Sequence, residues 1–278
     1  MNAIEIQRLE KSYPGFELKL DLALPQGCIM GLIGENGAGK TTTIKLLLGL
    51  IRADGGSISV LGQSGEADLR LVKEEIGVVF DEPSFPESLT AENIDRVMAG
   101  IYCHWDSAAY FSYLKRLSIP ESKPFKSFSR GMKMKLSIAV ALSHNAKLLI
   151  LDEPTSGLDP VVRDEVVEIF SEFTRDENRS VLISSHIVSD LEKLCDYIAF
   201  LHKGKLLLCE EMDRLLEEYG LVHCAPEVLT GLSRQDIIGR KDSAYGVSAI
   251  VRRSAAPAGL SLSPVSIEEL FVFMAKEV

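Results

Sequence analysis

The sequence is poor in cysteine, in basic charge and in long apolar runs, and each shortage excludes a class of protein. Its 278 residues include five cysteines but no C-x-x-C pair, which argues against a zinc site or a disulfide framework and favours reduced thiols in the cytosol. The longest apolar runs, such as residues 148–151, are far shorter than the roughly 20 residues of a membrane-spanning helix. The formal net charge is −10, whereas a surface that binds a nucleic-acid backbone is basic. We therefore expect neither a transmembrane segment nor a nucleic-acid partner.

Short apolar runs alternate with stretches of helical periodicity over the first 215 residues. Such runs are typical of strands buried on both faces of a parallel sheet; they are residues 28–33, 76–80, 148–151 and 181–184. Residues 16–24 instead alternate strictly between apolar and other residues, as a half-buried strand does. Residues 197–210 contain two apolar runs around a His-Lys-Gly-Lys turn, which predicts a hairpin.

Residues 82–140 differ from their surroundings, because β-like runs are scarce and aromatic residues gather there. We interpret this stretch as an inserted helical subdomain, whose aromatics either fill its own core or mark an interface. After about residue 215 the strong motifs stop, so residues 216–278 are expected to form a small C-terminal accessory region. The clustered aromatics are Tyr102, Trp105, Tyr110, Phe111 and Tyr113.

The strongest motif is GENGAGKTT at residues 34–42, directly after the apolar run 28–33. It satisfies G-x-x-x-x-G-K-[ST], in which the backbone curls around phosphates, the lysine reaches the β- and γ-phosphates, and the threonine hydroxyl binds Mg²⁺. No N-K-x-D motif for guanine occurs, which disfavours a GTPase. Nucleotide contacts are expected from Asn36, Gly37, Gly39, Lys40, Thr41 and Thr42.

Two carboxylates and a histidine follow the later apolar runs. Asp152 is expected to hold Mg²⁺ together with Thr41, and Glu153 to orient or deprotonate the attacking water. His186 ends the next buried run and would contact the γ-phosphate; the alternative is a structural hydrogen-bonding histidine. Because parallel strands end at one edge of a sheet, these side chains should lie together.

Residues 129–133, SRGMK, form a second place where a phosphate could bind. Ser129 and Gly131 stand just ahead of a helical pattern, so backbone N–H groups and the positive end of the helix dipole would face an anion. The alternative is that Ser129 only caps its own helix.

The order of these motifs resembles that of the ATP-binding cassette (ABC) ATPases over about residues 1–215, and most of all the single-cassette ATP-binding subunits of bacterial ABC-2-type exporters. The resemblance implies an α/β fold: a P-loop NTPase (RecA-like) core with a mostly parallel sheet, an N-terminal antiparallel β subdomain, the inserted helical subdomain and a small C-terminal extension. It also implies that two cassettes pair head to tail. Each ATP would then lie between the phosphate loop of one cassette and residues 129–133, the signature loop, of the other.

Further positions carry over from the family one by one. Tyr13 stands where an aromatic stacks on adenine, and Asp159, in SGLD, where a loop acts across the dimer. Asp81 replaces a glutamine that in many cassettes touches Mg²⁺ and senses the membrane subunit, so it is expected close to the metal. Arg130 replaces a glycine of the signature loop, and would either add a charge contact to phosphate or crowd the interface.

The resemblance implies an ATPase that powers a membrane transporter, with export of a peptide, drug or lipid as its task. The expected partners are a second cassette (another copy or a sister ATPase subunit) and separate transmembrane permease subunits, at the cytoplasmic face of the membrane. The aromatic-rich subdomain and residues 80–90 would form the groove that receives a permease helix. One rival is a soluble clamp acting on ribosomes or DNA, disfavoured by the single cassette and the acidic charge; another is a non-hydrolysing regulatory cassette, disfavoured by the intact motifs.

Overall fold

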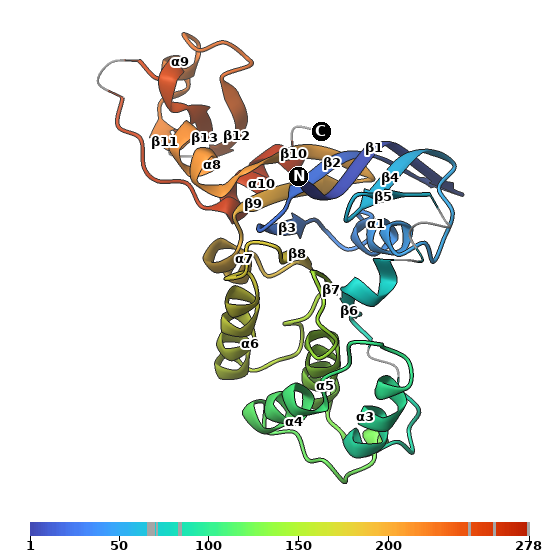
Figure 1. Cartoon of the computed structure of the whole chain (residues 1–278). Coiled ribbons are helices and arrows are strands. Elements are labelled where there is room, and N and C mark those ends of the chain that lie inside the picture. Colours follow the sequence, from blue (N-terminus) through green and yellow to red (C-terminus); the bar gives the residue numbers. More distant parts are fainter. Residues whose placement is uncertain (66–69, 71, 83–84, 244–245, 258–259, 277–278) are drawn as a thin grey trace.

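Ten strands form one sheet among the described residues (Figure 1). The computed structural model describes residues 1–65, 70, 72–82, 85–243, 246–257 and 260–276. The strand order is β5-β4-β1-β2-β10-β9-β3-β8-β7-β6. The strands are β1 (Asn2–Tyr13), β2 (Phe16–Pro25), β3 (Ile29–Ile33), β4 (Gly55–Val60), β5 (Gln63–Ser64), β6 (Ile76–Val79), β7 (Leu148–Asp152), β8 (Ser180–Ser185), β9 (Tyr197–His202) and β10 (Lys205–Glu211).

The parallel half of the sheet consists of β9, β3, β8, β7 and β6, which pair in parallel in that order. Every residue of β3, β7 and β8 is buried, because helices cover both faces and leave no solvent side for polar residues. The prediction of buried parallel strands is confirmed. The carboxyl ends of β3, β7 and β8 lie at one edge, and the phosphate loop, Glu153 and His186 follow them there.

The other half of the sheet is largely antiparallel, and it is built by the N-terminal residues. Strand β1 pairs antiparallel with both β2 and β4. The predicted alternation of residues 16–24 is confirmed, since Leu18, Leu20, Leu22 and Leu24 are buried and the residues between them are exposed. The predicted hairpin forms from β9 and β10, whose turn uses Gly204 with φ +79°.

The inserted residues are helical, as expected, and Figure 1 shows their helices below the sheet. The helices are α3 (Ala91–Ala99), α4 (Ser107–Arg116) and α5 (Arg130–Leu142). Each begins at a side chain that accepts a hydrogen bond from the backbone three residues on: Thr90, Asp106 and Ser129. Tyr110 is fully buried between these helices, and Trp105, Phe111 and Tyr113 pack against the same core. These four aromatics therefore stabilise the subdomain itself.

Further helices and short 3₁₀ turns lie elsewhere among the described residues. The helices are α1 (Lys40–Leu47), α6 (Pro160–Phe173), α7 (Val188–Leu194) and α8 (Met212–Glu218), and the turns are Lys73–Glu75, Phe125–Ser127 and Arg253–Ala255. Helix α8 spans the boundary that the sequence suggested near residue 215. No helix among the described residues is both long enough and apolar enough to cross a membrane.

The C-terminal residues form a second sheet of order β11-β13-β12, with β11 (Tyr219–Cys224), β12 (Ile237–Ser243) and β13 (Gly246–Arg252), beside the short helix α9 (Pro226–Leu229). This sheet and helix pack around a small hydrophobic core of their own, which includes Val222, Leu229 and Val251. Helix α10 (Ile267–Lys276) then returns to the cassette, where Phe271 packs on Phe200 with ring centroids 5.3 Å apart.

Candidate nucleotide-binding and catalytic site

The phosphate loop connects β3 to α1 and can close only because of its glycines. A Cβ atom on Gly34 would lie 2.5 Å from the carbonyl oxygen of Leu201, and Gly39 adopts φ +114° just before α1. Lys40 is buried, with 6% of its surface exposed. Its Nζ donates to the carbonyl oxygen of Gly34 at 2.7 Å and lies 3.5 Å from that of Glu35. The loop therefore holds a buried ammonium group at the amino end of a helix.

A pocket of about 250 Å³ opens above this loop. Its wall includes the first turn of α1, where backbone N–H groups have no partner within the helix and are free to bind an anion. The six residues of the phosphate-loop motif that were expected to contact nucleotide lie in the wall, whereas Tyr13, Ser129 and Gly131, also expected to contact it, do not line this pocket. The full lining is Phe16, Glu35, Asn36, Gly37, Gly39, Lys40, Thr41, Thr42, Asp81 and Glu153.

Asp152, the last residue of β7, is held by two hydroxyl groups. Thr41 Oγ1 donates to its Oδ2 at 2.8 Å, and Ser184 Oγ donates to its Oδ1 at 2.6 Å. Asp152 is buried, with only 2% of its surface exposed. No group of three or more His, Cys, Asp or Glu among the described residues could hold a metal alone. Thr41 and Asp152 suit Mg²⁺, which in phosphate sites takes few protein ligands and completes its shell with phosphates and water.

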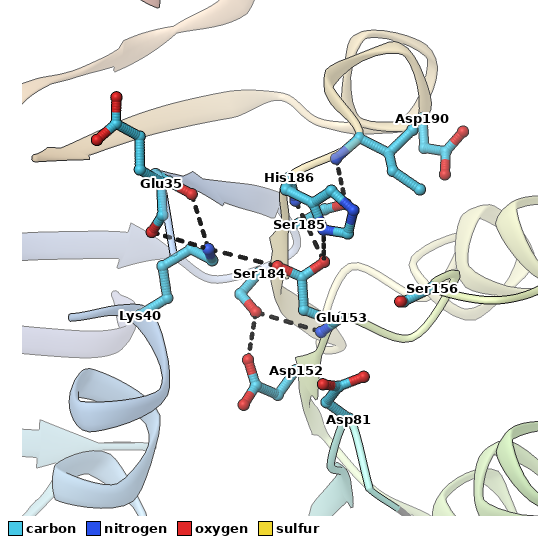
Figure 2. A network of polar contacts seen from close by, with 12 residues as sticks. Glu35, Lys40, Asp81, Asp152, Glu153, Ser156, Ser184, Ser185, His186 and Asp190 are labelled. Carbon is cyan, nitrogen blue, oxygen red and sulfur yellow. Dashed lines mark hydrogen bonds and ion pairs between the residues drawn. The ribbon is translucent and has the colours of Figure 1, made fainter. Parts of the chain in front are cut away.

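Glu153 stands at the centre of the polar network in Figure 2. Its φ of +52° is a strained value for a residue with a side chain, and its backbone N–H donates to the carbonyl oxygen of Ser184 at 3.0 Å. Its Oε1 lies 3.4 Å from Lys40 Nζ, while its Oε2 lies 2.6 Å from Nδ1 of His186. The backbone N–H of His186 donates to the same Oε2 at 3.2 Å. Strain and hydrogen bonds together aim the carboxylate at the pocket.

His186 was predicted to contact the γ-phosphate, and the structure places its Nδ1 on Glu153 instead of in the pocket wall. Its side chain is 54% exposed, so the opposite ring nitrogen, Nε2, is the one left for a ligand. The Nδ1 contact is of the kind expected of a hydrogen-bonding histidine, and contact of Nε2 with the γ-phosphate stays a prediction.

Asp81 lies in the pocket wall, as its assignment close to the metal requires, but it also has a partner from the signature loop. Arg130 Nη2 lies 2.5 Å from Asp81 Oδ1 and 3.3 Å from Ser156 Oγ. Ser129 caps α5 by accepting from the backbone N–H of Met132 at 3.2 Å, which is the structural alternative for this serine. Ser129 and Gly131 do not line the pocket of their own chain among the described residues.

Phe16 is an aromatic residue of the pocket wall that the sequence placed only in a strand. Tyr13 lies at the end of β1, 43% exposed, with Lys11 Nζ 5.5 Å from its ring centre. Stacking of Tyr13 on adenine stays a prediction. Phe16 directly follows the Pro14–Gly15 turn, and its approach to Gly39 left no signal in the sequence. Ser184 was also missed, although a hydroxyl residue in an otherwise apolar strand end marks such a contact.

Comparison with known proteins gives this geometry its context. The family model described as ABC transporter matches residues 18–156. The lantibiotic transport ATP-binding protein SrtF of Streptococcus pyogenes is 38% identical over 76% of this chain and 91% of its own. The bacitracin transport ATP-binding protein BcrA of Bacillus licheniformis is 39% identical over 68% of this chain and 62% of its own.

A solved structure shares the fold. It is a dimeric ATP-binding cassette, MJ0796, in a post-hydrolysis state with ADP and phosphate, at a TM-score of 0.66 and 19% identity over 75% of this chain and 98% of that chain. The family match and the similarity to SrtF agree with the phosphate loop, the Asp152–Glu153 pair and the placement of both at one sheet edge. This chain belongs to the ABC transporter family, as one of its ATP-binding cassettes.

Proposed function

We propose that this chain is the ATP-hydrolysing subunit of a membrane exporter whose cargo is a peptide, a drug or a lipid. The observation that carries the proposal is the network of Lys40, Glu153 and His186, in which Lys40 and Glu153 line the nucleotide pocket. The names of the relatives support a role in transport, since SrtF and BcrA are described as ATP-binding proteins of lantibiotic transport and bacitracin transport.

The residues of the pocket fit a triphosphate with Mg²⁺. The first turn of α1 and Lys40 supply donors and positive charge to the phosphates, and Thr41 and Asp152 would hold the ion. Bound there, Mg²⁺ would neutralise charge on the phosphate oxygens. Asp81 is close enough to take part as a third oxygen donor.

Glu153 is the group we assign to the attacking water. Its carboxylate is held from one side by Lys40 and from the other by His186, so it needs no reorganisation to accept a proton or orient a water molecule. Lys40 offsets negative charge that builds on the phosphates, and His186 fixes Glu153 while presenting Nε2 toward the γ-phosphate.

A second cassette would complete the site. Ser129 and Gly131 lie outside their own chain's pocket, at the amino end of a 13-residue helix, and are placed to cap a nucleotide held by a partner. The pairing of MJ0796, described as dimeric, supports this arrangement. Two copies of this chain are the simplest pair, and a sister ATPase subunit is the alternative.

Permease subunits would bind at a groove between the core and the inserted helices. This groove, of about 210 Å³, is mostly apolar, and its lining includes exposed Leu50 and half-buried Phe80 and Tyr102. Part of the loop that the sequence assigned to this contact, residues 83–84, lies outside the described residues. Binding there would hold the chain at the cytoplasmic face of the membrane.

The rival functions explain fewer observations. A clamp on ribosomes or DNA does not account for relatives described as transport proteins. A non-hydrolysing cassette does not account for a strained Glu153 held between Lys40 and His186.

Substitution of Lys40 tests the proposal. Wild type should hydrolyse ATP in a Mg²⁺-dependent manner, and Lys40→Ala should lower the rate by on the order of 100-fold, because a buried charge at the phosphates is lost. Lys45→Ala, which removes an exposed lysine from the same helix, is the matched control and should keep the rate. Equal phosphate release by wild type and Lys40→Ala would refute the assignment.

A further inference from the structure

The side chain of Arg130 joins three loops of its own chain. Its Nη2 lies 2.5 Å from Asp81 Oδ1 and 3.3 Å from Ser156 Oγ. Its stem crosses Gly157, where a Cβ atom would lie 3.3 Å from Arg130 Cδ. Gly157 has φ +74° and so favours glycine for its backbone as well. The signature loop is thus fastened to the pocket wall and to the 156–159 loop at once.

We propose that Arg130 is a positioning residue that neutralises Asp81 in the wall of its own chain's nucleotide pocket and thereby allows ATP to bind beside that carboxylate. The proposal rests on the proposed function, since it takes the pocket to be the ATP site. It differs from both sequence-based expectations for Arg130, a charge contact to phosphate or crowding of the interface, because it assigns the guanidinium to this chain's own pocket wall.

The charges of the pocket wall give the reason. Three carboxylates line it, Glu35, Asp81 and Glu153, against a single ammonium group, Lys40. That ammonium is already engaged by the carbonyl oxygen of Gly34 and by Glu153. A triphosphate entering this wall meets like charges, and each uncompensated carboxylate weakens its binding. Within the part of the chain that the structure describes, Arg130 is the cation paired with Asp81.

The Arg130 side chain is 55% exposed and the Asp81 side chain 44% exposed, and this exposure limits how much the ion pair changes ATP affinity. An ion pair at this exposure is partly screened by water and salt, so its removal should change ATP affinity by about two- to fivefold rather than by orders of magnitude. The loss of ATP affinity should also depend on the charge of the side chain at position 81. A purely structural role of Arg130 would not require this dependence.

The test is a double-mutant cycle on the dissociation constant of ATP, measured by calorimetry with the full chain. EDTA in the buffer separates the effect from any part that Asp81 takes in Mg²⁺ binding. Arg130→Ala should weaken ATP binding about threefold, and Arg130→Lys, which keeps the charge, should restore most of it. In the Asp81→Asn background Arg130→Ala should have little effect, because the charge to be neutralised is absent.

Controls separate this inference from the proposed function. Lys135→Ala removes a cation from the same helix outside the signature loop, where its Nζ donates to the carbonyl oxygen of Leu117 at 3.1 Å, and should not change the affinity. Salt at about 0.5 M should shrink the Arg130→Ala effect. Should Arg130→Ala fold poorly, Asp81→Asn alone carries the test and should tighten ATP binding, since it removes from the pocket wall a negative charge that the exposed ion pair neutralises only in part.

Two results would overturn the inference: an Arg130→Ala loss that persists unchanged in the Asp81→Asn background, or no loss at all together with unchanged binding by Asp81→Asn. Failure of wild type to bind ATP would instead overturn the proposed function, so the two failures are distinguishable.

Discussion

His186 Nδ1 lies 2.6 Å from Glu153 Oε2, and the backbone N–H of His186 donates to the same oxygen at 3.2 Å (Figure 2). His186 thus orients the carboxylate of Glu153 through both its ring and its backbone. The other oxygen, Oε1, is left 3.4 Å from Lys40 Nζ at the pocket. The strained φ of Glu153 shows that this orientation is imposed by the surroundings and is not a local preference of the chain.

His186→Ala should lower the turnover of ATP on the order of 10²- to 10³-fold, because Glu153 loses its orienting partner and the γ-phosphate loses an imidazole. The affinity for ATP should change little, since phosphate-loop contacts remain. Steady-state phosphate release and calorimetric ATP binding check the two halves. His104→Ala, at an exposed histidine of the helical subdomain, serves as the control. A variant with a normal turnover number would remove His186 from the catalytic assignment.

Ser184→Ala should raise the Mg²⁺ concentration needed for half-maximal hydrolysis by about tenfold, a typical cost of losing a group that orients a metal ligand. Ser184 Oγ donates to Asp152 Oδ1 at 2.6 Å, so the alanine frees Asp152 to rotate. The matched control is Ser185→Ala, next in the same buried strand, whose hydroxyl accepts from the backbone N–H of Ile187 at 2.9 Å. Titration of activity with Mg²⁺ compares them; equal midpoints would contradict the role of Ser184.

His144 should make the protein less stable to unfolding as the pH falls. Burial lowers the pKa of its imidazole in the folded chain, where it lies against the Tyr102 ring at 4.0 Å and Nδ1 lies 3.0 Å from the Glu74 carbonyl oxygen. The unfolded chain then binds the proton more readily, so the stabilising contribution is complete above the unfolded pKa, near 6.5, and is lost below it.

Urea unfolding between about pH 7.5 and 5 checks this sign. The free energy of unfolding should fall less steeply with falling pH in His144→Asn than in wild type. His104→Asn, at an exposed site, should keep the wild-type slope. Parallel curves for wild type and His144→Asn would show that the histidine does not contribute.

Local sequence patterns were enough to predict the strands and the phosphate loop that position the site. Continuous apolar runs predicted the parallel strands, and the spacing of Gly34, Gly39 and Lys40 predicted the phosphate loop, because these features depend on neighbouring residues alone. The convergence of Asp152 and His186 on one edge followed from parallel topology.

Contacts between distant residues were beyond the sequence. The direction of the Arg130 side chain, 49 residues from Asp81, depends on how the inserted helices pack against the core. The same holds for Ser184 on Asp152, and for Phe16 in the pocket wall, where its ring lies beside Gly39 of the phosphate loop.

The solution mass of Glu153→Gln, by light scattering after size-exclusion chromatography with and without Mg-ATP, tests most directly whether two copies of this chain hold ATP between them. The amide cannot accept the proton of water, so a closed pair should accumulate. We predict the mass of two chains with Mg-ATP, one chain without it, and no pairing when Ser129→Phe is added, since the bulky ring blocks the cap on the partner's nucleotide. A single-chain mass at saturating Mg-ATP, or a pair indifferent to Ser129→Phe, would contradict this arrangement.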